Sequence, residues 1–147
     1  MYRTFREAVA FAIAQEKEAI AIYDLFSKRA TKPATKAMFE ALVAEERQHE
    51  RTLAGLKPEQ LAAAVAKWVS GGAAAGGQIN FDPDMDFVAA LKLAMQREDE
   101  AAELYQTLRD KTDDPTLKRL FAALVEQEQG HKQKLQDEHD SVVLKDY

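Results

Sequence analysis

The sequence predicts an all-α fold, a four-helix bundle in which two antiparallel hairpins are joined by one long crossover. Four long segments of the 147-residue chain repeat apolar residues at the spacing of one helix face. Gly and Pro are sparse, at six and four residues, while 46% of the residues are hydrophobic and 31% are charged. This composition is typical of a globular, helix-rich domain. We expect a single domain over residues 1–147.

Four helices account for most of the chain. They are expected over about residues 4–30, 33–55, 83–111 and 115–138. Pro33, Pro83 and Pro115 each suit a first helical turn, where the missing N–H costs little. Asp82 and Asp114 directly precede two of these prolines, so we expect them to be N-caps.

The links between these helices differ in length. The segments ATKP and TDDP are short, and short links join antiparallel neighbours. The link over residues 56–82 contains an amphipathic piece with Leu61, Val65, Trp68 and Val69, followed by GGAAAGG. A helix of about 25 residues is roughly 37 Å long, so this link can run the length of the bundle and start the third helix at the far end. We expect Trp68 to anchor this crossover; a flexible linker between two separate units is the alternative.

The two predicted hairpins resemble each other in sequence. A shift of 82 residues aligns residues 5–55 with 87–137 without a gap, and 16 of the 51 positions are identical. The repeat does not keep every charged residue: Glu45 aligns with the neutral Gln127. The identical pairs include Glu16 with Glu98, Tyr23 with Tyr105, Phe39 with Phe121, Glu46 with Glu128, and His49 with His131. We interpret the pattern as an internal duplication, with the hairpins related by a pseudo-two-fold axis.

Polar residues interrupt the apolar stripes at matched positions. Glu46 and His49 are three residues apart on one stripe, so they point the same way. The second half repeats this pair, and the helix before each pair carries a further Glu on its own apolar stripe. The complete set is Glu16, Glu46, His49, Glu98, Glu128 and His131.

Folding these stripes inward brings four carboxylates and two imidazoles together. Desolvating each carboxylate would cost several kcal/mol, so the four cannot all stay ionised without a partner. No Lys or Arg occupies matched positions on the inward faces. Two divalent ions would balance the four negative charges, unless the groups take up protons instead. Carboxylate oxygens with imidazole nitrogens suit iron or manganese, and also zinc.

Two tyrosines, two further glutamates and one histidine are polar residues that we do not expect to bind metal directly. Tyr23 and Tyr105 each lie about two helical turns after a matched glutamate. We expect each hydroxyl to donate to a metal ligand of the opposite half, beside the simpler role of packing in the core. Glu18 and Glu100 also match across the repeat, but they fall on the far side of the helix and are expected to be solvated. His139 is expected to be exposed in a polar tail.

Composition argues against several other classes of protein. The net charge of −5 and the lack of a basic run argue against nucleic-acid binding. The chain has no cysteine, which excludes disulfides and thiolate metal sites. No uncharged apolar run reaches the roughly 18 residues of a membrane helix, and the N-terminus lacks the apolar core of a signal peptide. We expect a cytoplasmic protein.

With these residues identified, the chain resembles the rubrerythrin and ferritin-like di-iron carboxylate superfamily. The resemblance covers nearly the whole chain. It rests on Glu16 followed by Tyr23, EERQH at 45–49, Glu98 followed by Tyr105, and EQGH at 128–131. It implies a ferritin-like bundle with two iron ions, each bound by one terminal carboxylate and one histidine, and two carboxylates that bridge the pair. The terminal carboxylates would be Glu16 and Glu98, and the histidines would be His49 and His131. The bridging carboxylates would be Glu46 and Glu128.

Two departures from the family pattern matter for function. Rubrerythrins usually carry a Cys-rich rubredoxin module that delivers electrons; this chain has no cysteine, so electrons would come from an external donor, rubredoxin-like or another reductase. They also tend to carry a second Glu three residues after the helix-three ligand, where this chain has Ala101, matched by Ala19 in the first half. The site is thus a symmetric, minimal version, closer to a generic ferritin-like oxidation site.

The resemblance implies an oxidoreductase that reduces hydrogen peroxide or dioxygen at two irons. The alternative is a ferroxidase or iron-storage module without sustained turnover, although the sequence shows no mineral-nucleating cluster and no long fifth helix. A structural bundle with zinc or no metal is the third hypothesis. Symmetric dimers are the commonest oligomers, so we expect a homodimer.

Overall fold

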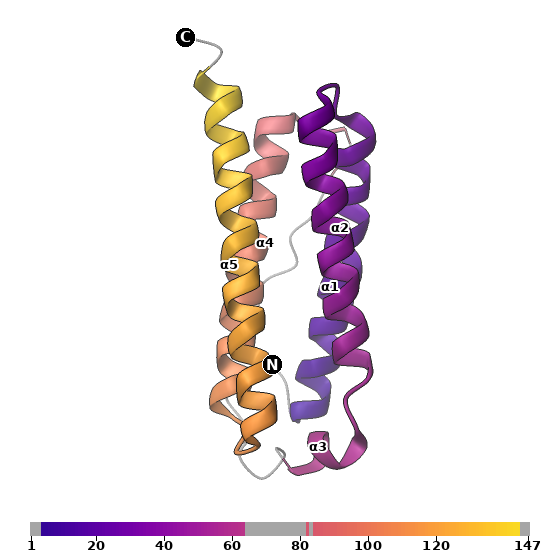
Figure 1. Ribbon diagram of the computed structural model, residues 1–147, viewed down its shortest axis with the longest axis vertical. Coiled ribbons are helices and arrows are strands. Elements are labelled where there is room, and N and C mark those ends of the chain that lie inside the picture. Colours follow the sequence, from indigo (N-terminus) through magenta and orange to yellow (C-terminus); the bar gives the residue numbers. More distant parts are fainter. Residues whose placement is uncertain (1–3, 64–81, 83, 145–147) are drawn as a thin grey trace.

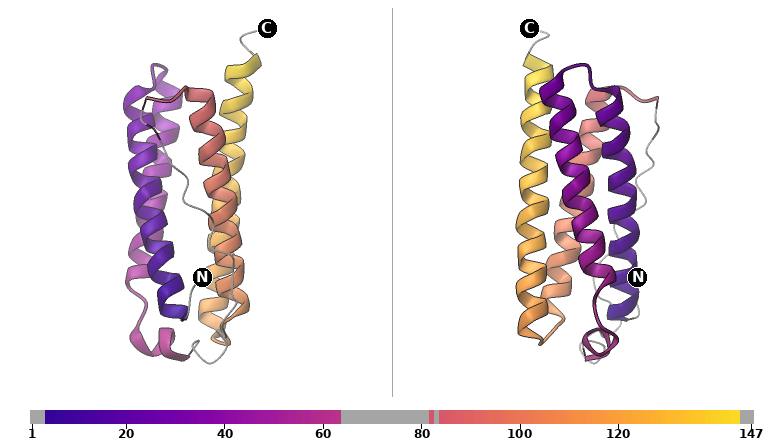
Figure 2. Two further views of the ribbon diagram at one scale, coloured as in Figure 1. Left: turned by 180° about the vertical axis from the view of Figure 1, so that it is seen from behind. Right: turned by 45° about the vertical axis from the view of Figure 1, so that its right-hand side comes forward.

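The computed structural model of the chain describes residues 4–63, 82 and 84–144. The helices are α1 (Phe5–Arg29), α2 (Pro33–Ala54), α3 (Pro58–Ala63), α4 (Phe87–Asp110) and α5 (Pro115–Leu144). The four long helices lie side by side in a bundle (Figure 1, Figure 2), which confirms the predicted all-α fold. None of the helices in this described part combines the length and apolar character needed to cross a membrane.

The connection between the two hairpins has the predicted direction. α2 ends beside α3 at one end of the bundle, and α4 begins at the opposite end (Figure 1). α3 is the short helix expected in this link, and its Leu61 joins a buried cluster with Phe5 and Leu53. α1 packs on α4 and α2 packs on α5, so the two hairpins contact each other along the bundle. Val65, Trp68, Val69 and GGAAAGG lie outside the described residues, so the anchoring role of Trp68 stays a prediction.

The helix starts agree with the sequence at Pro33 and Pro115, the two of the three prolines that lie within the described residues. Pro33 occupies the first turn of α2, and Asp114 caps α5 because its Oδ1 accepts from the N–H groups of Thr116 at 2.8 Å and Leu117 at 3.4 Å. The predicted start of the third long helix at residue 83 is wrong. α4 begins at Phe87, and its cap is Asp86, which accepts from the N–H of Ala89 at 3.4 Å.

The expected cap of that helix, Asp82, has a different role. Its Oδ1 accepts from the N–H of Asp84 at 2.9 Å, which closes a turn before the helix. Pro83 lies outside the described residues. Phe87, the first residue of the helix, packs beside Phe26 with the ring centroids 5.7 Å apart.

α5 is longer than predicted and ends at Leu144 rather than near residue 138. Hydrogen bonds four residues apart, from Gln133 to Asp137 and from Gln136 to Asp140, both at 2.9 Å, support the additional turns. The expectation that His139 is exposed in a tail is therefore wrong: it lies within α5, and its side chain is 15% exposed.

The core consists of two apolar clusters, one on each side of the polar centre of the bundle. They repeat each other in geometry. Phe5 meets Phe121 edge-on at 5.8 Å and 71°, and the equivalent Phe87 meets Phe39 at 6.2 Å and 82°. The pseudo-two-fold relation predicted from the repeat is thus present in the packing of the rings.

Candidate metal centre

Six buried polar side chains converge between the two apolar clusters. α1 and α4 contribute one glutamate each, and α2 and α5 contribute a Glu–His pair each, because residues three apart share a helix face. None of the six is more than 2% exposed. They are Glu16, Glu46, His49, Glu98, Glu128 and His131, the same six that the sequence singled out.

The six side chains form two groups that share Glu46 and Glu128. The first group, here called the Glu16 position, adds Glu16 and His49 to the shared pair. The second, the Glu98 position, adds Glu98 and His131. Within each group, one donor atom per residue lies within 4.8 Å of the others. Two neighbouring positions with shared carboxylates are the arrangement of a two-metal centre.

Each histidine directs Nδ1 at the carboxylates of its own position. His49 Nδ1 lies 3.0 Å from Glu128 Oε1, 3.6 Å from Glu16 Oε1 and 3.7 Å from Glu46 Oε1. His131 Nδ1 has the equivalent neighbours in the other position, at 2.6 to 3.7 Å. The two rings are nearly parallel, at 14°, with centroids 5.8 Å apart. Both imidazoles are therefore oriented to bind a cation through Nδ1.

Each of the six side chains has one buried atom that makes no hydrogen bond of suitable geometry with the described residues, although four of these atoms lie close to one another in two His–Glu pairs, at 2.6 and 3.0 Å. The six atoms are Glu16 Oε2, Glu46 Oε1, His49 Nδ1, Glu98 Oε2, Glu128 Oε1 and His131 Nδ1. Buried polar atoms are nearly always paired, so six such atoms in one cluster indicate a place for a ligand. Four carboxylates and two imidazoles fit two divalent ions, with iron or manganese suited best and zinc also compatible.

In the metal-free protein, burial and mutual contacts shift several pKa values of the cluster toward the protonated forms. Burial, together with the neighbouring carboxylates, raises the pKa of Glu46 and of Glu128 well above the ordinary value. Burial alone would lower the pKa of the histidines, but contacts with the glutamates outweigh it, so the pKa of His49 is raised and that of His131 is raised to about 10. Burial would also raise the pKa of Glu16, yet its contacts with Glu46 and His49 lower it. Metal binding would displace these protons.

Tyr23 and Tyr105 make the predicted hydrogen bonds to the opposite hairpin. The Tyr23 hydroxyl donates to Glu98 Oε1, and the Tyr105 hydroxyl donates to Glu16 Oε1 at 2.5 Å. Burial and the adjacent carboxylates raise the pKa of both hydroxyls well above the ordinary value, so both remain donors. Each hydroxyl holds one oxygen of a glutamate and leaves Oε2 available to a metal ion.

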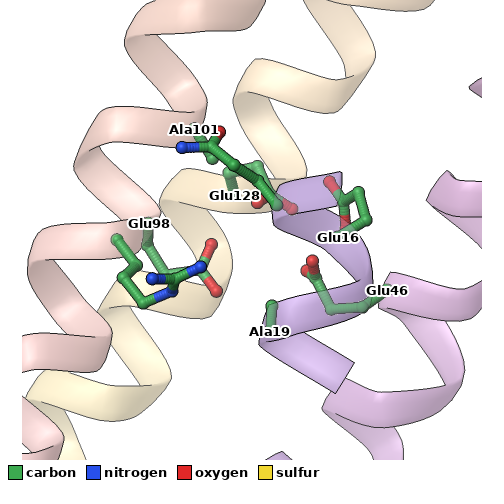
Figure 3. Close-up of a pocket in the computed structure, with 8 residues that line it drawn as sticks. Glu16, Ala19, Glu46, Glu98, Ala101 and Glu128 are labelled. Carbon is green, nitrogen blue, oxygen red and sulfur yellow. The ribbon is translucent and has the colours of Figure 1, made fainter. Parts of the chain in front are cut away.

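A small cavity adjoins the four carboxylates. Its volume is about 10 Å³, room for about one water-sized molecule. Figure 3 shows Glu16 and Glu46 on one side of it and Glu98 and Glu128 on the other. The remaining lining residues are Gln15, Ala19, Arg97 and Ala101. The short side chains of Ala19 and Ala101 leave this space open.

Two contacts behind the histidines were missed in the sequence. Gln127 Oε1 accepts the Nε2–H of His49, and Glu45 Oε2 accepts the Nε2–H of His131. The repeat comparison discarded both residues because they differ between the halves. The signal that could have found them is their place in the chain, since each directly precedes a shared glutamate.

A second unmatched pair lines the cavity. Gln15 and Arg97 are equivalent under the repeat and directly precede Glu16 and Glu98. Arg97 Nη2 pairs with Glu18 Oε2 at 2.7 Å, and Glu18 is 49% exposed, as expected of a surface carboxylate. Arg97 therefore places a basic side chain beside the cavity in one half, where its counterpart Gln15 is neutral.

Residues 7–139 match the sequence profile of the rubrerythrin family. Among solved structures, the fold is similar to a crystal structure at 2.30 Å resolution that is described as a ferritin-like diiron-carboxylate protein from Thermotoga maritima. The TM-score is 0.77, with 19% identity, and the match covers 93% of this chain and 95% of that chain. No curated protein matches the sequence significantly.

Proposed function

The chain belongs to the rubrerythrin family, and from this premise we propose that it is a non-haem diiron oxidoreductase that reduces hydrogen peroxide or dioxygen with electrons from an external donor. The observation that carries the proposal is the buried cluster of four carboxylates and two imidazoles, arranged in two groups that share Glu46 and Glu128. They provide two adjacent four-ligand positions with shared carboxylates, the arrangement that two-metal redox chemistry uses.

The candidate glutamate ligands differ in how many metal positions they reach. Glu46 and Glu128 reach both positions, so they would keep the two ions together while the charge of the ions changes. Glu16 and Glu98 reach one position each and are held from behind by a tyrosine hydroxyl of the opposite hairpin. Ligands fixed in this way keep their geometry without reorganising during turnover.

Two ferrous ions, when bound, supply the two electrons that convert hydrogen peroxide and two protons into two water molecules, or dioxygen and two protons into hydrogen peroxide. The chain selects the oxidant by size. The cavity beside Glu16 and Glu98 has room for about one water-sized molecule, so only an oxidant of a few atoms would approach the ions. The apolar clusters on both sides of the centre exclude bulk water and larger reductants.

Steady-state peroxide consumption by the iron-loaded protein tests the proposal. With excess peroxide and an added reductant, we expect many turnovers per chain. Glu46→Ala removes a ligand shared by both positions, and His131→Ala removes the imidazole of one, so both variants should lose two-iron occupancy and turnover. A variant that keeps two irons per chain and full turnover would contradict the ligand assignment.

Glu126→Ala is the matched control, because Glu126 lies on α5 two residues before Glu128 but is exposed. It should keep the iron content and the turnover of the unmodified chain. Iron oxidation that stops after one filling of the site, with iron taken up into a large assembly, would support the ferroxidase or storage alternative instead.

The proposal includes partners that the cluster itself does not identify. Since the chain has no cysteine to hold an iron–sulfur or rubredoxin-type centre, we propose a separate electron-donor protein, rubredoxin-like or another reductase, in the cytoplasm. We also propose a homodimer, the commonest symmetric assembly. Sedimentation equilibrium of the iron-loaded protein checks the dimer, and reduction of the oxidised protein by purified rubredoxin checks the donor.

A further inference from the structure

The two metal positions differ in the residue behind each histidine. Glu45 and Gln127 occupy equivalent places in the 82-residue repeat. Glu45 Oε2 accepts the Nε2–H of His131, and Gln127 Oε1 accepts the Nε2–H of His49. Both hydrogen bonds cross between α2 and α5. The geometry is therefore the same in both halves, whereas the acceptor is a carboxylate in one half and a neutral amide in the other.

The acceptor behind a histidine affects how strongly the ring binds a cation. With the proton on Nε2, the lone pair is on Nδ1, which faces the carboxylates of each position. A carboxylate polarises the N–H bond more than an amide does, and this makes the opposite nitrogen a better metal ligand. Glu45 is 45% exposed, so its place behind His131 does not require complete desolvation of the carboxylate.

We propose that the two positions bind metal unequally and that the Glu45–Gln127 difference sets the order, with the Glu98 position filled first. This inference rests on the dimetal site proposed above. Of the two positions, the one that holds His131 has the carboxylate behind its imidazole. The six candidate ligands are thus matched between the two halves, whereas the residues hydrogen-bonded to the two histidines differ.

Two basic residues act against this preference. Arg97 directly precedes Glu98 and lines the cavity, where its charge disfavours a cation, while its counterpart Gln15 is neutral. Lys134 Nζ lies 3.9 Å from Glu45 Oε1, so its positive charge offsets part of the negative charge that Glu45 presents to His131. The effect of Glu45 is therefore measured by exchanging it with Gln127 rather than from the unmodified chain alone.

Single-position variants isolate each site. Glu16→Ala leaves the Glu98 position complete, and Glu98→Ala leaves the Glu16 position complete. Each is titrated with Co²⁺, which is stable to air oxidation, by isothermal calorimetry. We expect the tighter Co²⁺ site of Glu16→Ala to bind more strongly than that of Glu98→Ala. The two variants are matched, because each removes one terminal carboxylate and the partner of one tyrosine.

The Co²⁺ affinities of Glu16→Ala and Glu98→Ala are then measured again with Glu45→Gln and Gln127→Glu added together to each variant. This exchange keeps the composition and the net charge. Changing the partner of a metal-binding histidine alters affinity by at least about tenfold, so the ratio of the two affinities should shift about 100-fold toward the Glu16 position. A ratio that stays the same after the exchange overturns the inference and leaves the dimetal site standing. Absence of Co²⁺ binding by the unmodified chain overturns both.

A second measurement avoids removing any ligand. In the otherwise unmodified chain, Gln127→Glu should raise the product of the two stepwise Co²⁺ association constants about tenfold, and Glu45→Gln should lower it about tenfold. Gln129→Glu is the control, because it adds the same charge at an exposed position of α5. An equal rise with Gln129→Glu would show a general charge effect and overturn the role of the histidine contact.

Discussion

Single hydroxyl groups orient the terminal carboxylates, and this role can be tested in the metal-free protein. Tyr23→Phe removes the O–H that donates to Glu98 and leaves a buried carboxylate oxygen without that partner. We expect a loss of about 1–3 kcal/mol in the free energy of unfolding, measured by urea denaturation in the presence of a chelator. Tyr105→Phe should cause a similar loss, because its hydroxyl makes the equivalent bond to Glu16. An unchanged urea midpoint in both variants would contradict the assigned bonds.

Residue identity at the ligand positions was predictable, whereas the residues behind the ligands were not. Glu46 and His49 are visible because a polar pair interrupts an apolar stripe and recurs after 82 residues. Glu45 and Gln127 show neither signal. They face partly toward solvent, and their contact with a histidine of the other hairpin exists only once α2 and α5 are packed together.

At the level of secondary structure, α5 has a better N-cap than α4. Asp114 accepts from two backbone N–H groups, the shorter at 2.8 Å, whereas Asp86 accepts from one at 3.4 Å. Asp114→Ala should lower the free energy of unfolding by about 1–2 kcal/mol, and Asp86→Ala should lower it by less. Urea unfolding of the two variants checks this order, and a larger effect for Asp86→Ala would contradict it.

The start of α4 shows why helix boundaries were harder to predict than helices. The segment DPDMD offers more than one Asp that could cap a helix, and the local sequence does not choose between them. The choice depends on Phe87, which packs against Phe26 and Phe39 from the other hairpin. The carbonyl of Met85 also accepts from Arg29 Nη2 at 3.3 Å, which joins this turn to the end of α1.

For the whole molecule, the shifted pKa values predict that the metal-free protein loses stability as the pH rises. The ordinary pKa is 4.5 for Glu46 and Glu128 and 6.5 for His131; folding raises all three, that of His131 to about 10. A group with a raised pKa stabilises the fold fully below its unfolded value and loses that contribution as the pH rises through the folded value. The lowered pKa of Glu16 acts in the opposite sense, but only near and below pH 4.5.

The thermal midpoint of the metal-free protein should therefore fall between about pH 5 and pH 10. Differential scanning calorimetry in chelator across this range checks it. His131→Gln should flatten the profile at its alkaline end, because the group that titrates there is gone. A midpoint that rises steadily across the range in the unmodified protein would contradict the predicted proton uptake on folding.

Metal binding should stabilise the whole bundle, because all four long helices carry candidate ligands. A ligand that binds only the folded state at 100 times its dissociation constant adds about 2.7 kcal/mol. We expect Co²⁺ to raise the thermal midpoint at pH 7.5, and Glu46→Ala to lose most of this rise. Glu126→Ala should keep it, which separates loss of a ligand from loss of a surface charge.

The sequence by itself determined the helical bundle, its crossover direction and the six candidate ligands. These follow from helical period, from link lengths and from a repeat within one chain, all of which are local or can be compared along the chain. The family match over residues 7–139 and the similar solved structure agree with this fold.

Only the tertiary structure decided which atoms share a metal position, which residue lies behind each histidine and where α4 begins. Each depends on side chains from different hairpins that meet across the bundle, and no periodicity along one helix encodes such a meeting. The duplication made the ligands symmetric, whereas packing between α2 and α5 placed a carboxylate behind one histidine and an amide behind the other.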